Sequence, residues 1–267
     1  MTQEKVSPVP PEIKIAERDL PWIGEWSKIF QETGTYGYIK GGYIRDVISN
    51  IINGTDLVPK DVDLMVAGRI NKVVGVVLGN GGQMVERRSR KKTPVFRVAL
   101  PSFPGVDFEL GVALIKPELY ENATPEQIRL YEATNTDFDV NSMSIGLSDL
   151  DLLDPHGGIQ AIKNRQISLL DTQSLYRNPE NILRGFKVKD KLGANFSYIT
   201  SQIISEHSKV LRKVKRPFLD SQLRPLLTSV NATEIWQELT DLGITQNLTD
   251  GDVATLEQAK QIFLRNE

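Results

Sequence analysis

The segment KGGYIRD, at Lys40–Asp46, is the most informative part of the chain for its fold. It directly follows an apolar run, Tyr36–Ile39, which predicts a strand, and it leads into a helical pattern, IRDVISNIIN, that Gly54 closes. Glycines let a backbone approach a phosphate closely, and the first N–H groups of a helix are free to bind one. Taken alone, a glycine pair is more often a strand-to-helix turn that requires positive φ, which we expect at Gly42.

Acids on the next predicted strand supply the second feature. In DVDLMV, Asp61 and Asp63 alternate with apolar residues, so both carboxylates project from one face of the strand. Further on, VDFEL places Asp107 and Glu109 on one face in the same way. Clustered carboxylates repel one another unless a cation lies between them, and Mg²⁺ prefers such hard oxygen ligands. Acids on an exposed strand face are common, so the pattern gains weight from the glycine pair that precedes it.

The composition excludes several classes of protein. The chain has 267 residues, of which 40% are hydrophobic and 25% charged, as in ordinary globular proteins. Zero cysteines exclude a thiolate zinc site, an iron–sulfur cluster and a cysteine nucleophile, and the two histidines argue against a histidine-rich site. The net charge of −2 argues against indiscriminate nucleic-acid binding. With no spanning-length apolar run and no visible secretory signal, we expect a cytoplasmic protein without membrane contact.

The first half of the chain mixes expected strands and helices. Three strand-like runs lie at Gln83–Arg88, Val95–Leu100 and Val106–Leu114, and the basic stretch RRSRKK, at Arg87–Lys92, reads as a turn between the first two. The run Lys72–Leu78 fits a strand or a helix equally well. These patterns predict an α+β domain around one sheet.

The second half is expected to be all helical after DPHGG, at Asp154–Gly158. Asn178 before proline predicts a helix N-cap, and Asn231 with Glu234 predicts a capping box. The chain is therefore divided into a loose arm at residues 1–19, a sheet-containing domain at 20–170 and a helical domain at 171–267.

Five ordered blocks resemble one family, the class II tRNA nucleotidyltransferases and bacterial poly(A) polymerases of the DNA polymerase beta superfamily. The family's GGxVRD motif resembles Gly41–Asp46, and its DxD strand and third carboxylate resemble Asp61, Asp63 and Asp107. The family's RRDFTINAM, DPFGG and neck motifs resemble TDFDVNSM, DPHGGIQAIKN and RNPENILRGFKVKDKLGANF. The resemblance covers residues 38 to about 196 and implies a nucleotidyltransferase head with a mixed β-sheet and flanking helices, followed by an all-helical neck and body.

The resemblance also implies a function and a set of site residues. It implies a transferase that adds nucleotides, without a template, from nucleoside triphosphates to an RNA 3′ end, most often that of tRNA, by a two-metal mechanism. The implied cofactors are two Mg²⁺ ions, with ATP and also CTP as candidate substrates. The implied catalytic and metal-binding residues are Asp61, Asp63 and Asp107. The implied nucleotide-binding residues are Gly41, Gly42, Arg45, Asp46, Asp137, Asn141, Asn178, Asn181 and Arg184.

Several positions depart from the family pattern. Asn135 and Thr136 replace two arginines, and Val112 lies near the place of a third. In the neck, Asn178 and Asn181 replace the aspartate and arginine that read the base edge in the family. CCA addition, A addition and polyadenylation therefore stay open, as does the oligomeric state. The alternative is a divergent member, with altered or lost turnover, that binds nucleotide, RNA or a protein partner.

Two basic clusters are candidate RNA contacts, because lysine and arginine position nucleic-acid phosphates without reading the sequence. Their candidate members are Arg87, Arg88, Arg90, Lys91, Lys92, Lys209, Arg212 and Lys213. Solvated charged faces in a protein of balanced charge explain such clusters equally well.

Overall fold

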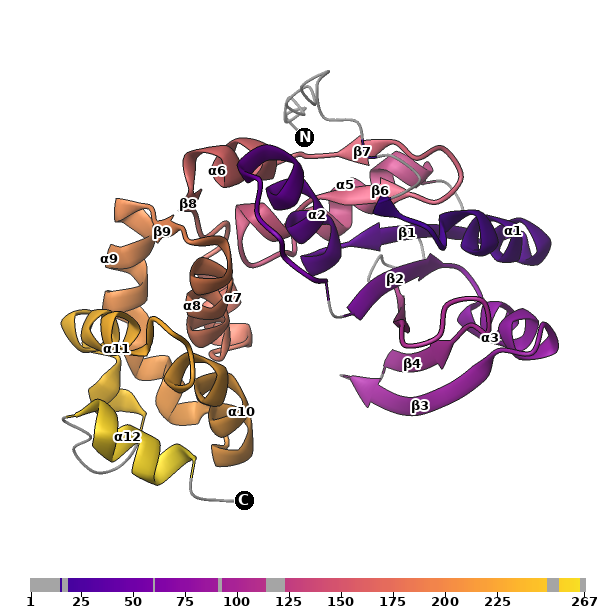
Figure 1. The fold of residues 1–267 in the computed structure, drawn as a ribbon. Helices are drawn as coiled ribbons and strands as arrows, with labels where there is room; N and C mark the ends of the chain where they lie inside the picture. The colour runs from indigo at the N-terminus through magenta and orange to yellow at the C-terminus, as the bar shows by residue number, and fades with distance from the viewer. Residues whose placement is uncertain are drawn as a thin grey trace. The chain divides into compact units, whose positions relative to one another are not determined.

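The computed structural model describes Ile15 and residues 19–59, 61–90, 93–113, 123–248 and 255–264. The chain divides into two compact units, residues 1–163 and 164–267 (Figure 1). The arm expected at residues 1–19 lies outside the described residues, apart from Ile15 and Asp19. The functional domain bounds at 20–170 and 171–267 stay a prediction.

A mixed seven-stranded sheet forms the centre of the first unit, and its strands follow the order β3–β4–β5–β2–β1–β6–β7. β2 and β5 run parallel, whereas the other neighbouring strands run antiparallel. The strands are β1 (Tyr36–Lys40), β2 (Asp61–Ala67), β3 (Gln83–Arg90), β4 (Thr93–Ala99), β5 (Asp107–Val112), β6 (Ser144–Gly146) and β7 (Leu152–Leu153). This sheet with its flanking helices confirms the predicted α+β class.

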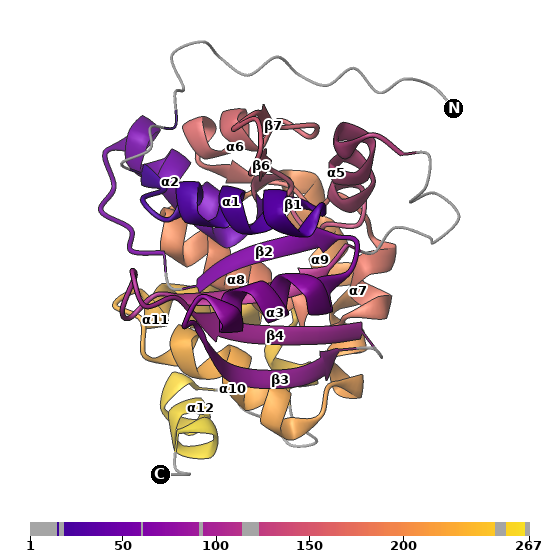
Figure 2. The ribbon, with the colours of Figure 1, turned by 90° about the vertical axis from the view of Figure 1, so that its right-hand side faces the viewer.

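Helices cover both faces of the sheet, and the ambiguous run after β2 is helical. The helices are α1 (Ile23–Thr33), α2 (Gly42–Asn53), α3 (Ile70–Gly79), α5 (Pro125–Ala133), η2 (Asp139–Asn141) and α6 (Gly158–Asn164). Figure 2 shows α1 and α3 side by side on one face. There, Trp22 and Trp26 pack against Phe108 on β5, with ring centroids 5.5 and 5.2 Å apart. On the other face, Ile128 of α5 packs into a cluster with Tyr38 and Met65.

The second unit is almost entirely helical. Its elements are α7 (Gln173–Arg177), α8 (Asn181–Leu192), α9 (Tyr198–His207), η3 (Ser208–Lys213), α10 (Arg216–Leu227), α11 (Ala232–Asp241), η4 (Thr245–Asn247) and α12 (Leu256–Phe263). The expectation of a purely helical second half is wrong in one place, where β8 (Gln166–Ile167) pairs in parallel with β9 (Asn195–Phe196). Within the described ranges, no helix has the length and apolar character that a membrane crossing requires.

Two predicted helix starts differ from the structure. Asn178 is the last-turn cap of α7, because its N–H donates to the Ser174 carbonyl, and α8 begins only at Asn181. Asn231 does precede α11, but its side chain makes no capping bond. The Asn231 amide donates instead to Asp190 Oδ1 at 2.7 Å, so tertiary contact replaces the predicted capping box.

Tyr36 supplies a pH-dependent test of the packing around β1. Its hydroxyl is buried without a hydrogen-bond partner among the described residues, and burial raises the pKa of Tyr36 to about 12. Between pH 10 and 12 the unfolded chain loses this proton and the folded chain keeps it, so the free energy of unfolding falls as pH rises. We expect Tyr36→Phe to be at least as stable as the wild type at pH 7, with an advantage that widens between pH 10 and 12 in urea unfolding.

The matched control is Tyr198→Phe, because the Tyr198 ring is 74% exposed. An equal pH response in the two variants would contradict the role assigned to burial of Tyr36.

Candidate active site

Four carboxylates share one face of two neighbouring strands. In the parallel register of β2 and β5, Asp61 lies beside Asp107 and Asp63 lies beside Glu109. The residues that alternate with these acids are apolar and at most 1% exposed, as the sequence pattern predicts. We call the side of the sheet that carries the four acids the acid face; α1 and α3 cover the opposite side.

Two arginines reach the acid face from the β3–β4 hairpin. Arg97 on β4 is the register partner of Glu109, and its Nη1 lies 3.8 Å from Asp107 Oδ2. Arg88 on β3 forms an ion pair with Glu109. These guanidinium groups offset part of the negative charge of the acids. Sequence reasoning did not identify Arg97, although its alternation with buried Phe96 and Val98 is a signal that could have done so.

The donor set on the acid face is suited to magnesium. Asp61, Asp63 and Asp107 provide hard oxygen ligands on adjacent strands. In the part of the chain that the structure describes, no group of three acid or histidine side chains is gathered closely enough to hold a metal ion. The fit of the three aspartates to the ion rests on the chemistry of their oxygens and on their shared face.

The glycine turn lies against the acid face. Gly41 has φ 79° and ψ −132°, and Gly42 is the first residue of α2. A Cβ atom added to Gly41 would lie 3.7 Å from Asp63 Oδ2, so the turn and the acid strand are neighbours. The positive φ expected at Gly42 is found at Gly41, because Gly42 already belongs to the helix.

The Arg45 side chain is enclosed by residues that the sequence also assigns to nucleotide binding. Its Nε and Nη2 donate to Asp46 Oδ1 at 3.0 and 2.8 Å, and its Nη1 donates to Asn141 Oδ1 at 2.8 Å. Asn141 Nδ2 in turn donates to Asp137 Oδ1 at 3.1 Å. The structure thus brings together four residues that the sequence assigns to nucleotide binding. It favours a positioning role for Arg45, since three of its side-chain nitrogens are bonded within the protein.

Lys40 forms an ion pair beside the glycine turn that sequence reasoning missed. Its Nζ lies 2.5 Å from Glu132 Oε2 on α5, with the lysine side chain 31% exposed and the glutamate 3%. Lys40 shares a sheet face with Tyr38, whose register partner is Met65. Because Asp63 and Met65 point to the same side of β2, Lys40 lies on the acid face. The feature of the sequence that could have identified Lys40 as a site residue is its place directly before the glycine pair.

The predicted base-reading residues lie at the start of α8 in the second unit. Asn181 is the first residue of the helix and is buried, and its N–H donates to the Asn178 carbonyl at 3.0 Å. Arg184 follows one turn later and is exposed. The structure therefore gathers these three residues around a single helix start.

The first basic cluster is not a turn in the structure. β3 continues to Arg90, so Arg87 and Arg88 belong to the strand. Arg87 lies over the Phe96 ring, with its Cζ atom 5.6 Å from the ring centroid. Lys91 and Lys92, together with the Arg90 side chain, lie outside the described residues.

The second basic cluster lies on η3. Lys209, Arg212 and Lys213 are exposed, and Arg212 Nε donates to Asn247 Oδ1 at 2.9 Å. The charged side chains of these residues are exposed to solvent, and their contact with RNA stays a prediction.

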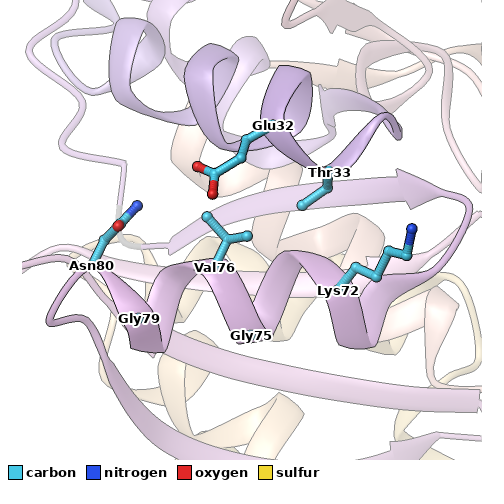
Figure 3. Close-up of a pocket in the computed structure, with 7 residues that line it drawn as sticks. All are labelled: Glu32, Thr33, Lys72, Gly75, Val76, Gly79 and Asn80. Carbon is cyan, nitrogen blue, oxygen red and sulfur yellow. The ribbon is translucent and has the colours of Figure 1, made fainter.

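A cavity of about 440 Å³ lies between α1 and α3, as Figure 3 shows, on the side of the sheet opposite the acids. Its lining residues are Glu32, Thr33, Lys72, Gly75, Val76, Gly79 and Asn80. None of them belongs to the predicted site.

Comparison with known proteins shows what this chain is similar to. Residues 37–168 match the family model described as the poly(A) polymerase head domain. The A-adding tRNA nucleotidyltransferase of Aquifex aeolicus (strain VF5) is 23% identical over 223 residues, which are 80% of this chain and 26% of that protein. This chain therefore spans about a quarter of the length of that relative.

Solved structures share the fold. A CCA-adding enzyme in complex with CTP superimposes with a TM-score of 0.75 at 19% identity, covering 94% of this chain and 59% of that one. A Thermotoga maritima CCA-adding enzyme complexed with tRNA gives a TM-score of 0.73 at 19% identity, covering 94% of this chain and 58% of that one.

The enclosure of Arg45 predicts a large effect on stability. Arg45→Met removes a charged partner from buried Asp46, so we expect the free energy of unfolding to fall by about 3–5 kcal/mol in urea unfolding. Arg69→Met, at an exposed arginine in the same unit, is the control and should change stability by less than about 0.5 kcal/mol. Equal stabilities for the two variants would rule out a positioning role for Arg45.

Proposed function

We propose that this chain, whose residues 37–168 match the poly(A) polymerase head domain, transfers nucleotides from nucleoside triphosphates to an RNA 3′ end, as its resemblance to an A-adding tRNA nucleotidyltransferase supports. The observation that carries this proposal is the pairing of Asp61 with Asp107 on the acid face, next to the Gly41 turn. The proposed acceptor is tRNA, with ATP and CTP as donors. The proposed location is the cytoplasm.

The residues of the acid face and the turn have complementary roles in this proposal. Gly41 leaves room for the triphosphate, and the N-terminus of α2 presents free N–H groups to it. Asp61, Asp63 and Asp107 would hold two Mg²⁺ ions. When bound, such ions neutralise charge on the transferred phosphate and lower the pKa of the attacking hydroxyl.

The bonded network behind the turn holds the nucleotide-facing residues in place. Arg45 joins α2 to Asn141 on η2, and Asn141 joins Asp137. A sugar bound beside Asp137 and Asn141 would therefore be positioned by the same network that fixes the glycine turn. Positioning of this kind contributes to transfer because the 3′-hydroxyl and the α-phosphate must meet in line.

Removal of one metal-binding carboxylate tests the proposed chemistry. We expect Asp61→Asn and Asp63→Asn each to lower nucleotide incorporation by at least about 100-fold, since each loses several kcal/mol of transition-state stabilisation. Both should keep the fold, because the change removes repulsion between carboxylates. The assay follows labelled ATP and CTP added to a tRNA that lacks its 3′ end, with Mg²⁺, on a sequencing gel.

Asp56→Asn, at an exposed acid five residues before β2, is the matched control and should retain activity. Undiminished incorporation by the Asp61 and Asp63 variants would refute the two-metal assignment. A wild-type protein that binds ATP and RNA but adds no nucleotide would instead support a binding function without turnover.

The start of α8 tests the selection of the nucleotide. A neutral amide at position 178 makes weaker bonds to a base edge than an ionised carboxylate does. We therefore expect Asn178→Asp to change the ratio of ATP to CTP incorporation, whereas Asn195→Asp, at an exposed residue of β9, should leave the ratio unchanged. An ordered C-C-A addition by the wild type would show that other residues select the base.

A further inference from the structure

KGGYIRD contains two cations, and the structure gives them opposite surroundings. The Arg45 side chain is only 9% exposed, and its nitrogens are bonded to Asp46 and Asn141. To reach a ligand, Arg45 would have to break bonds inside the protein and leave buried Asp46 without this partner, which is costly. Arg45 is therefore poorly placed to contact a phosphate.

Lys40 has the accessibility that Arg45 lacks. Its side chain is 31% exposed, and its Nζ has one hydrogen-bond partner among the described residues, Glu132 Oε2 at 2.5 Å. An ammonium group carries three N–H donors, so two are left for a ligand. Lys40 also lies on the acid face and immediately precedes Gly41. A Cβ atom added to Gly41 would lie 3.7 Å from Asp63 Oδ2, so this end of β1 is close to the acids.

Glu132 gives Lys40 a fixed direction. The carboxylate is buried on α5, with only 3% of its side chain exposed, and the helix packs on the same side of the sheet through Ile128. A buried carboxylate needs a cationic partner, so Glu132 keeps the flexible lysine stem on this part of the acid face. A lysine held in this way loses less conformational freedom when a ligand binds.

We propose that Lys40 binds the triphosphate of the incoming nucleotide and that Glu132 positions its ammonium group for this contact. The proposal rests on the proposed function, since it assigns a further residue to the same site. The ligand chemistry is that of a polyphosphate, so the contribution of Lys40 should grow with the number of phosphates.

The experiment must separate a phosphate contact from simple neutralisation of Glu132. Lys40→Met alone would take the Lys40 ammonium away from the buried Glu132 carboxylate, so the test uses the double variant Lys40→Met with Glu132→Met, in which both charges are removed together. A second variant, Glu132→Gln, removes the acid and keeps the lysine, so it tests the positioning role separately from the phosphate contact. Melting temperatures check that each protein is folded. Titration calorimetry then gives Kd for ATP, ADP and AMP with Mg²⁺, and for tripolyphosphate.

We expect the double variant to bind ATP and tripolyphosphate at least about tenfold more weakly than the wild type, with a smaller change for AMP, because a charged hydrogen bond is lost. Glu132→Gln should weaken ATP binding less, by about threefold, because the ammonium keeps its charge and loses its fixed direction, and an unchanged affinity in this variant would refute the positioning role of Glu132. A folded double variant with wild-type affinity for ATP, or an equal loss for AMP and ATP, would overturn the proposal. Should the apolar pair fail to fold, Lys40→Gln with Glu132→Gln preserves both volumes and answers the same question.

Failure of this inference is distinguishable from failure of the proposed function. If the wild type binds and transfers nucleotides and the double variant binds them equally well, only the role of Lys40 is wrong. If the wild type binds neither ATP nor tripolyphosphate, both proposals are wrong.

Discussion

The parallel pairing of β2 with β5 is the constraint on which the candidate site depends. In this register Asp61 lies beside Asp107 and Asp63 beside Glu109, so acids that are 46 residues apart in the chain share one face. The pairing is fixed by burial on the other face, where the intervening apolar residues pack beneath α1 and α3. A slip of one residue would turn every acid on β2 into the core, which the burial of charge forbids.

Two polar connections join this sheet to the segments around it. Arg45 links the helix after the glycine turn to Asn141 and, through it, to Asp137. Lys40 links the end of β1 to Glu132 on α5. Each connection includes a buried polar group, Asn141 in the first and Glu132 in the second. Because breaking the bond would leave that group buried without this partner, each connection holds its segments in one arrangement.

Local pattern predicted much of the fold, and the errors arose where tertiary contact competes with local chemistry. Gly34, Gly54 and Gly193 end helices in the left-handed conformation, as glycine allows without a Cβ penalty. Asn231 failed as half of a capping box because Asp190, distant in sequence, takes its amide. Lys72–Leu78 could not be assigned from periodicity, since a short apolar run suits a buried strand as well as a helix.

From the order of residues alone it follows that Asp61 and Asp63 face the same way, because side chains alternate along any strand, and that a glycine turn precedes them. Which charges are available to a ligand depends on the three-dimensional packing. Lys40 and Arg45 lie five residues apart in one motif, yet one reaches solvent and the other is enclosed. That difference depends on Glu132, Asn141 and Asp46, and two of these lie more than 90 residues away. Long-range contacts, which no local pattern encodes, therefore set the electrostatics of the site.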